Sequence, residues 1–313
     1  HRVERTGRRS ALASIIKDGG DDPDVTHRAE IGARVTLLDD QEEAVRITGG
    51  RGVGRVTKPG LELDVGEPAI NPGPRTMITN SVREVFDELD CQPRAVEVEV
   101  FVPKGEELAE KTLNARLGIL GGISILGTTG VVTPMSHDAY IATIKAGIGV
   151  ARANTADTLV FTTGRRSERF AMDLYPDFLE EQFIQTGDFF KASLDMAAGF
   201  KEIRRIIYTV FFGKAVKMAL GFEHTHAAKS ELTLKELSAW ALEVTGDKDL
   251  AENIAAANTA RHAFEFIHPG HPDLLSHVGK KIVESATGFS QGRFRIRAVI
   301  FDFSGQVVWD SQN

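Results

Sequence analysis

The chain has 313 residues, of which 42% are hydrophobic and 26% charged, as expected of a folded protein large enough for two domains. Its 37 basic and 44 acidic residues give a net charge of −7, which argues against nucleic acid or an anionic membrane as a general partner. No stretch approaches the roughly 20 apolar residues of a membrane-spanning helix. A single cysteine, Cys91, excludes an internal disulfide and favours a reducing cytoplasm.

The region 1–115 is predicted to be an α+β domain. Short strand patterns separated by Gly, Pro and Asp occur at 33–38, 44–48, 61–65 and 95–102. The last of these alternates valine with glutamate, which is typical of a strand with one buried face. Apolar residues at helical spacing between 82 and 89 add a helix.

The region 116–290 is predicted to be a parallel α/β domain. Strand patterns followed by helices occur at 122–126, 158–161, 182–185 and 205–211, and a mainly helical stretch covers 229–286. Each strand runs into a turn that contains glycine. Because the carboxyl ends of parallel strands meet at one edge of a sheet, these four turns are predicted to form one ligand crevice.

The last region, 291–313, is predicted to be a hairpin that turns at Ser304-Gly305 and returns to a sheet. The predicted fold class is therefore α/β together with α+β. It combines a Rossmann-like parallel-sheet domain, a mixed α+β domain and the C-terminal hairpin.

The loop Gly127-Thr128-Thr129-Gly130 follows an apolar strand and precedes a helix with isoleucines at helical spacing. Its small residues would let the backbone approach a phosphate, a carboxylate or a nucleoside. The loop has neither the dinucleotide fingerprint nor the Gly-Lys-Ser/Thr ending of a P-loop. A tight turn without a ligand is the alternative.

As a whole, GGISILGTTGVVTPMS resembles the signature segment of the CbiD family, the cobalt-precorrin-5B C(1)-methyltransferases of anaerobic cobalamin biosynthesis. Four further segments resemble blocks of the same family in the same order: KDGGDDPDVTH, GGRGVGRVTKPGL, GEPAINPGPR and GEELAEKTLNARLG. The resemblance implies methyl transfer from S-adenosylmethionine to C-1 of cobalt-precorrin-5B, which gives cobalt-precorrin-6A.

The family resemblance also implies a site for the methyl donor, which we expect in the sheet crevice. The expected donor-binding residues are Gly121, Gly122, Gly127, Thr128, Thr129, Gly130, Thr163, Gly164 and Asp188. Asp188 is included because the turn after the second strand lacks the acidic residue that usually binds a ribose. No protein-bound metal is expected, since methyl transfer from a sulfonium needs no Lewis acid.

The implied substrate is a cobalt-containing tetrapyrrole with many carboxylates, which Arg and Lys would bind. The expected substrate-binding residues are Arg51, Arg55, Lys58, Arg75 and Arg116. The expected catalytic residues are His226, for proton handling, and Asp22, in an acidic run that could equally be a base, a cation site, a pocket wall or a plain turn.

Two other functions remain open at this point. A nicotinamide-dependent oxidoreductase could use the same crevice, although the missing fingerprint and the missing acidic residue count against it. A noncatalytic tetrapyrrole carrier is the other alternative. The sequence does not decide whether the protein forms a homo-oligomer.

Overall fold

The computed structural model describes residues 2–21, 24–39, 44–90, 94–132, 136–226 and 230–312. The chain divides into two compact units, residues 1–137 and 138–313. The division falls after the glycine-rich loop, so the segment 116–137, which the sequence assigned to the parallel domain, belongs to the first unit. Each unit has its own sheet and core.

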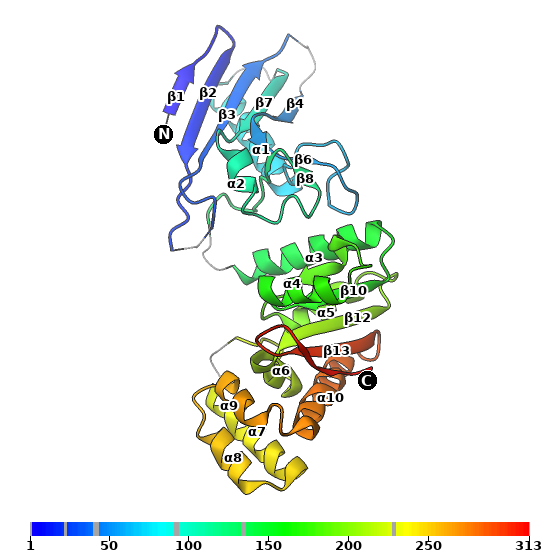
Figure 1. Cartoon of the computed structure of the whole chain (residues 1–313). Helices are drawn as coiled ribbons and strands as arrows, with labels where there is room; N and C mark the ends of the chain where they lie inside the picture. The colour runs from blue at the N-terminus through cyan, green and yellow to red at the C-terminus, as the bar shows by residue number, and fades with distance from the viewer. Residues whose placement is uncertain are drawn as a thin grey trace. The chain divides into compact units, whose positions relative to one another are not determined.

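The first unit contains most of the strands and two helices (Figure 1). The elements are β1 (Arg2–Arg5), β2 (Ser10–Ile16), β3 (Glu30–Leu37), β4 (Val45–Gly49), β5 (Gly52–Val53), β6 (Arg55–Val56), α1 (Pro72–Glu88), β7 (Val96–Phe101), α2 (Gly105–Ala109), β8 (Ile119–Leu120) and β9 (Gly122–Ile123). The predicted strand at 61–65 is wrong, because these residues form bends and turns.

The main sheet of the first unit has the order β1-β2-β3-β7-β4, with β4 parallel to β7 and the other pairs antiparallel. The predicted alternation in β7 is confirmed, since its valines are buried and the residues between them are half-buried. Val100, Ile70 and Ile123 form a small core with neighbouring apolar residues of α1 and α2.

The predicted strand at 122–126 is only partly formed, and it does not belong to the parallel sheet. Within the first unit, β9 pairs with β5, and β8 pairs with β6. The reason is tight backbone packing. A Cβ on Gly122 would lie 2.3 Å from the Gly52 carbonyl, and one on Gly52 would lie 1.9 Å from the Val102 oxygen. Glycine at these positions therefore lets backbones cross in contact.

The second unit is a sheet covered by helices on both faces (Figure 1). Its elements are α3 (His137–Ala153), β10 (Thr158–Thr162), α4 (Arg165–Leu174), the short 3-10 helix η1 (Glu180–Gln182), β11 (Phe183–Gln185), α5 (Phe190–Ala198), β12 (Arg205–Phe211), α6 (Phe212–Ala219), α7 (Ser230–Thr245), α8 (Lys248–Ala255), α9 (Ala260–Ile267), α10 (Pro272–Phe289), β13 (Arg295–Phe301) and β14 (Val307–Asp310).

The strand order in this sheet is β11-β10-β12-β13-β14. The first four strands are parallel, and β14 returns antiparallel to β13. The predicted C-terminal hairpin is thus present and extends this sheet. Its two strands are joined by a bidentate pair between Arg297 and Asp310, whose side chain is only 7% exposed.

Alternating residues of the strands divide the core into two parts. Leu159, Phe161 and Tyr208 face the larger part, which α3, α5, α6 and α10 share with apolar residues of α7, α8 and α9. Val160 and Ile207 face the smaller part under α4. With both faces covered, ligands can approach the sheet only at its edges and strand ends.

Candidate functional site

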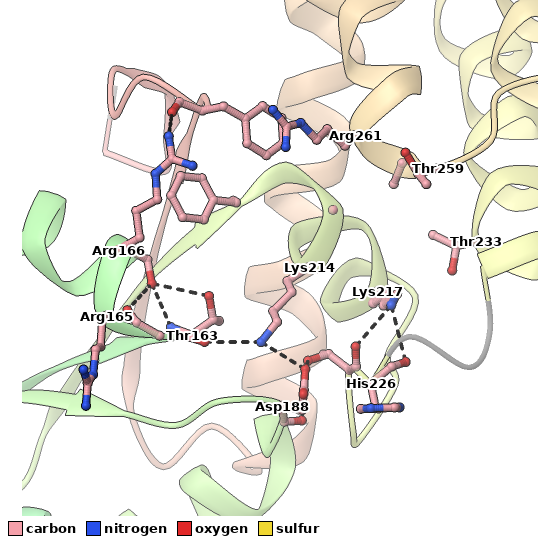
Figure 2. Close-up of a pocket in the computed structure, with 17 residues that line it drawn as sticks. Thr163, Arg165, Arg166, Asp188, Lys214, Lys217, His226, Thr233, Thr259 and Arg261 are labelled. Carbon is pink, nitrogen blue, oxygen red and sulfur yellow. Dashed lines mark hydrogen bonds and ion pairs between the residues drawn. The ribbon is translucent and has the colours of Figure 1, made fainter. Parts of the chain in front are cut away.

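A cavity of about 760 Å³ lies at the carboxyl ends of the parallel strands in the second unit (Figure 2). We call it the sheet-edge cleft. Its lining residues are Thr163, Gly164, Arg165, Arg166, Ser167, Asp188, Phe211, Gly213, Lys214, Lys217, Thr225, His226, Thr233, Thr259, Ala260, Arg261 and Phe303. Residues that follow β10, β11, β12 and β13 therefore meet in one place, as the topology of a parallel sheet requires.

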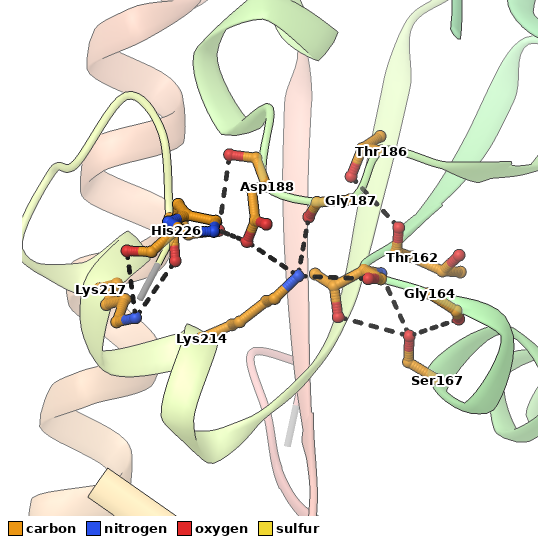
Figure 3. A network of polar contacts seen from close by, with 11 residues as sticks. Thr162, Gly164, Ser167, Thr186, Gly187, Asp188, Lys214, Lys217 and His226 are labelled. Atoms are coloured by element: carbon orange, nitrogen blue, oxygen red, sulfur yellow. Dashed lines mark hydrogen bonds and ion pairs between the residues drawn. The ribbon is translucent and has the colours of Figure 1, made fainter. Parts of the chain in front are cut away.

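Lys214 connects the ends of neighbouring strands (Figure 3). Its Nζ donates to the Thr163 carbonyl at 3.3 Å and to the Gly187 carbonyl at 3.2 Å, and it pairs with Asp188 Oδ1 at 3.0 Å. These acceptors use the three N–H groups of an ammonium. Lys214 therefore uses all its donors to hold the turns after β10 and β11 together.

Asp188 is a half-buried carboxylate with two supporting partners. Thr225 donates from Oγ1 to Asp188 Oδ1 at 2.9 Å, and its backbone N–H donates to the Asp188 carbonyl at 2.9 Å. Burial alone would raise the pKa of Asp188. The hydrogen bond and charge of Lys214, the Thr225 hydroxyl and the nearby His224 outweigh it and lower that pKa below its usual value. Asp188 is thus ionised at neutral pH.

The turn after β10 is fixed by its own hydroxyl groups. Ser167 is buried, and its Oγ donates to the Gly164 carbonyl at 2.9 Å and accepts from the Thr163 N–H at 3.1 Å. The turn leads directly into α4, whose first turn faces the cleft with Arg165 and Arg166. A helix N-terminus carries a partial positive charge, which adds to that of the two arginines.

Lys217 lies one turn after Lys214 on α6 and holds the segment that carries His226. Its Nζ donates to the Thr225 carbonyl at 3.2 Å and to the His226 carbonyl at 3.3 Å. Burial, together with the charge of Lys214, lowers the pKa of Lys217, while Asp188 acts in the opposite direction. The His226 imidazole itself is exposed at the cleft.

One wall of the cleft is a stack of two arginines and two phenylalanines. The rings of Phe211 and Phe303 are stacked with centroids 5.7 Å apart. The Arg166 guanidinium lies 5.4 Å from the Phe211 centroid, and that of Arg261 lies 4.4 Å from the Phe303 centroid. Arg166 also donates to the Phe303 carbonyl. These contacts attach the loop after β13 to α4 and α9.

The cleft carries a strong excess of positive charge. Five basic side chains line it, against the single carboxylate of Asp188, which is already paired with Lys214. In the described ranges, the other four basic residues, Arg165, Arg166, Lys217 and Arg261, have no carboxylate within ion-pair distance. The cleft is therefore suited to an anion.

The first unit contains the remaining residues that the sequence assigned to the methyl donor. Gly121, Gly127 and Gly130 have φ angles of +78°, +124° and +73°, and a Cβ on any of them would meet nothing within 4 Å. Thr128 and Thr129 are exposed. This loop has the open backbone that the sequence predicted. Gly122, by contrast, is buried, and its lack of a side chain lets its backbone contact that of Gly52.

Two of the basic residues predicted to bind the substrate flank one segment of the first unit. The exposed Arg55 donates to the Gly66 carbonyl. Arg75 Nε donates to the Ile70 carbonyl at 2.8 Å, and its guanidinium lies 3.7 Å from Glu67. Arg75 is therefore part of the local structure, whereas Arg55 is exposed apart from its bond to the Gly66 carbonyl.

The other three basic residues of this group also lie in the first unit. Arg51 is exposed, and Arg116 is half-buried. The aliphatic part of Lys58 packs over Gly118, where a Cβ would lie 2.5 Å from its Cβ and Cγ. Asp22 and Cys91 lie outside the described residues.

The sequence analysis expected Thr163, Gly164 and Asp188 in the sheet crevice and His226 as a catalytic residue, and all four line this cleft. It missed several other residues of the cleft. Lys217 follows Lys214 by one helical turn, a spacing that the sequence contains and that could have been used. Arg261 and Phe303 come from distant parts of the chain. Nothing local indicates that they meet, because their contact depends on the packing of α9 against the strand ends.

Two general features concern metals and membranes. Among the side chains that the structure describes, no group of three or more His, Cys, Asp or Glu residues could hold a metal ion. Within the same ranges, no helix is both long enough and apolar enough to cross a bilayer.

Comparison with known proteins places the chain in a family. The model of the CbiD family matches residues 1–134, and the model of the CbiD C-terminal domain matches residues 224–312. The cobalt-precorrin-5B C(1)-methyltransferase of Dechloromonas aromatica is 45% identical over 300 residues, which cover 95% of this chain and 76% of that protein. This chain belongs to the CbiD family.

A second relative has the same name, and one solved structure is also similar. The protein of Nitratidesulfovibrio vulgaris is 47% identical over 263 residues, which cover 83% of this chain and 66% of that protein, slightly less than two thirds of its length. A crystal structure of a cobalamin biosynthesis protein (cbiD) from Archaeoglobus fulgidus is 27% identical and covers 66% of this chain and 61% of its own, with a TM-score of 0.31.

Only one of the two CbiD family models covers residues of the sheet-edge cleft. The first ends close to the boundary of the first unit, at residue 134. The C-terminal model includes His226, Arg261 and Phe303, whereas Thr163, Asp188 and Lys214 lie in the stretch between the two models. The cleft of this CbiD chain is thus assembled from the C-terminal model region and the strands before it.

Proposed function

We propose that this chain transfers a methyl group from S-adenosylmethionine to C-1 of cobalt-precorrin-5B, giving cobalt-precorrin-6A, in cobalamin biosynthesis. The observation that carries the proposal is 45% identity over 95% of the chain with a relative named for this reaction. A cobalt-containing tetrapyrrole is then a substrate, and its cobalt arrives with it. The proposed compartment is the cytoplasm, on the basis of composition.

The strand order supports a finer interpretation of the second unit. Numbered along the chain, its parallel strands lie in the order 2-1-3-4, which is the start of a doubly wound, flavodoxin-like order within the Rossmann-like class. In such sheets ligands bind where the order reverses, here between β10 and β12. Thr163 follows β10 and Lys214 follows β12, so the sheet-edge cleft lies at this point.

Bound S-adenosylmethionine supplies a methyl group that its sulfonium has already activated. The protein must then align donor and ring carbon, exclude water and accept or relocate a proton. His226 is our proposed proton-handling residue, because its imidazole is exposed at the cleft while Lys217 holds its backbone.

The cleft does not fit the methyl donor well. S-adenosylmethionine carries a sulfonium and an ammonium against one carboxylate, so it is a net cation. Four basic residues without carboxylate partners would repel it. Asp188, expected to bind the ribose, is already paired with Lys214. The assignment of Thr163, Gly164 and Asp188 to the donor therefore lacks electrostatic support, and the open loop 127–130 of the first unit remains the proposed donor loop.

The test of the proposed function is incubation of the chain with cobalt-precorrin-5B and methyl-labelled S-adenosylmethionine. The expected product has gained one labelled methyl group by mass, and NMR locates the label at C-1. Omission of the donor serves as the control. Failure to transfer the label, with the tetrapyrrole still bound, would instead support a noncatalytic carrier, and tight binding of a nicotinamide dinucleotide would support an oxidoreductase.

A further inference from the structure

The four basic residues of the sheet-edge cleft that lack a carboxylate partner lie on different walls of the cavity. Arg165 and Arg166 come from the first turn of α4, Lys217 from α6 and Arg261 from the first turn of α9 (Figure 2). Basic residues of three helices thus line one cavity in a chain whose net charge is −7. Surface cations are ordinarily dispersed among acidic residues, so a group of four without carboxylate partners indicates an anionic ligand.

The rigidity of the walls strengthens this argument. Arg166 and Arg261 are held against the stacked rings of Phe211 and Phe303, and Lys217 is held by two backbone carbonyls. Side chains that are already ordered lose less entropy when they bind a ligand than mobile surface residues do. Arginine also matches the planar geometry of a carboxylate.

We infer that the sheet-edge cleft binds carboxylate side chains of the tetrapyrrole substrate, with Arg165, Arg166, Lys217 and Arg261 as their partners, and that it is not the site of the methyl donor. The identity of the anion rests on the proposed function. A single phosphate is the less suitable ligand, because the cations are spread around a cavity of about 760 Å³. The turn Thr163-Gly164-Arg165-Arg166 also lacks the P-loop ending.

The inference is tested by binding of uroporphyrin I, an available tetrapyrrole with eight carboxylates, followed by fluorescence at low ionic strength. The variants are Arg165→Gln, Arg261→Gln and the double variant, with Arg261→Lys to keep the charge. Arg169→Gln is the matched control, since Arg169 is exposed on the same helix as Arg165 but does not line the cleft. Affinity for S-adenosylhomocysteine is measured by calorimetry on each protein.

Each single substitution should raise the Kd for uroporphyrin roughly threefold, and the double substitution roughly tenfold, as expected for exposed charge pairs. Arg261→Lys should recover part of the loss, and Arg169→Gln should bind like the wild type. Affinity for S-adenosylhomocysteine should not fall in any variant. High salt should remove most of the difference between wild type and double variant.

Three outcomes would overturn the inference: wild-type binding by the double variant, an equal loss in Arg169→Gln, or a parallel loss of S-adenosylhomocysteine binding. Stronger binding of inorganic pyrophosphate than of uroporphyrin would also overturn it. The methylation assay separates this result from the proposed function. If the wild type does not methylate but the cleft variants still bind uroporphyrin more weakly than it does, only the proposed function is refuted. If the double variant methylates with an unchanged KM, only the cleft assignment is refuted.

Discussion

Lys214 and Asp188 form a half-buried ion pair, with Nζ and Oδ1 3.0 Å apart, that joins α6 to the turn after β11. Because the same ammonium also binds the Thr163 and Gly187 carbonyls, the pair fixes the base of the sheet-edge cleft. Its strength depends on ionised Asp188, whose pKa lies below its usual value. The geometry of the cleft is therefore linked to pH.

Substitution Asp188→Asn should lower stability at neutral pH by about 1.5–3 kcal/mol, the range for a hydrogen bond to a charged group. A carboxyl group with a lowered folded-state pKa stabilises the fold above its unfolded pKa of about 3.9, and the stabilisation is lost as pH falls through the lower folded value. The difference between wild type and variant should thus shrink as pH falls below about 5 and disappear only below the lowered folded-state pKa. Urea unfolding at several pH values measures it.

The matched control is Asp195→Asn, which removes an exposed pair with Lys191 on one helix. Solvent screens such exposed pairs, so this variant should unfold nearly like the wild type. An equal loss in both variants, or a difference for Asp188→Asn that does not shrink at all as pH falls below about 4, would contradict the role assigned to the ion pair.

Gly122 and Gly121 should respond differently to alanine although they are adjacent. A Cβ on Gly122 would lie 2.3 Å from the Gly52 carbonyl, so Gly122→Ala should destabilise the first unit by about 3 kcal/mol or more. At Gly121 there is open space, and only the positive φ of +78° opposes alanine, at a cost of about 1–2 kcal/mol. Chemical unfolding of both variants tests this order, which similar losses would refute.

Arg55 and Arg75 should differ because the backbone hydrogen bond of Arg75 is partly buried, whereas that of Arg55 is exposed. Arg75→Gln removes the hydrogen bond to the Ile70 carbonyl and should lower stability by about 1 kcal/mol. Arg55→Gln should leave the melting temperature unchanged and raise the KM for the tetrapyrrole severalfold, without changing affinity for S-adenosylhomocysteine. If Arg55→Gln weakens both ligands equally, Arg55 is not a substrate residue. Thermal melts and steady-state kinetics separate the two effects.

Much of the second unit could be predicted from local pattern. The strand 205–211 coincides with β12, and the hairpin at Ser304-Gly305 is present, because buried strands and tight turns have strong local signals. The convergence of the turns after β10 and β11 followed from topology alone. These are features that neighbouring residues determine.

The errors arise where distant backbones meet. The segment 122–126 has an apolar pattern that also suits a parallel strand, but Gly122 packs on Gly52, seventy positions earlier, and this contact decides its sheet. Likewise, Arg261 reaches the cleft only because α9 packs beside the strand ends. A single sequence carries no local sign of either contact, so the contribution of Arg261 to the cleft could not be foreseen.

His226 should affect turnover more than folding. Its imidazole is exposed, and its ring contact with His224 is long, at 6.1 Å between centroids. His226→Gln should therefore melt like the wild type, lower kcat by roughly 100-fold and flatten the pH dependence of kcat, as expected for a lost general base. His262→Gln, on α9, is the control. Unchanged turnover across the pH range in His226→Gln would end the proposed role.

Gly279 on α10 is in direct contact with Trp309 of β14, and this contact anchors the C-terminal strand. A Cβ on Gly279 would lie 2.3 Å from the indole ring, so Gly279→Ala must displace Trp309 and should destabilise the second unit by about 1–3 kcal/mol. In a Trp240→Phe background the remaining indole should shift its fluorescence emission to the red as it becomes more exposed.

Gly288, on the same helix, provides the control for this prediction, because a Cβ there would meet nothing within 4 Å. Gly288→Ala should stabilise the helix by about 0.5–1 kcal/mol, since alanine loses less backbone entropy than glycine, and it should leave the emission of Trp309 unchanged. If Gly279→Ala instead behaved like Gly288→Ala in both stability and fluorescence, the indole would not pack on α10, and β14 would be held mainly by its antiparallel pairing with β13.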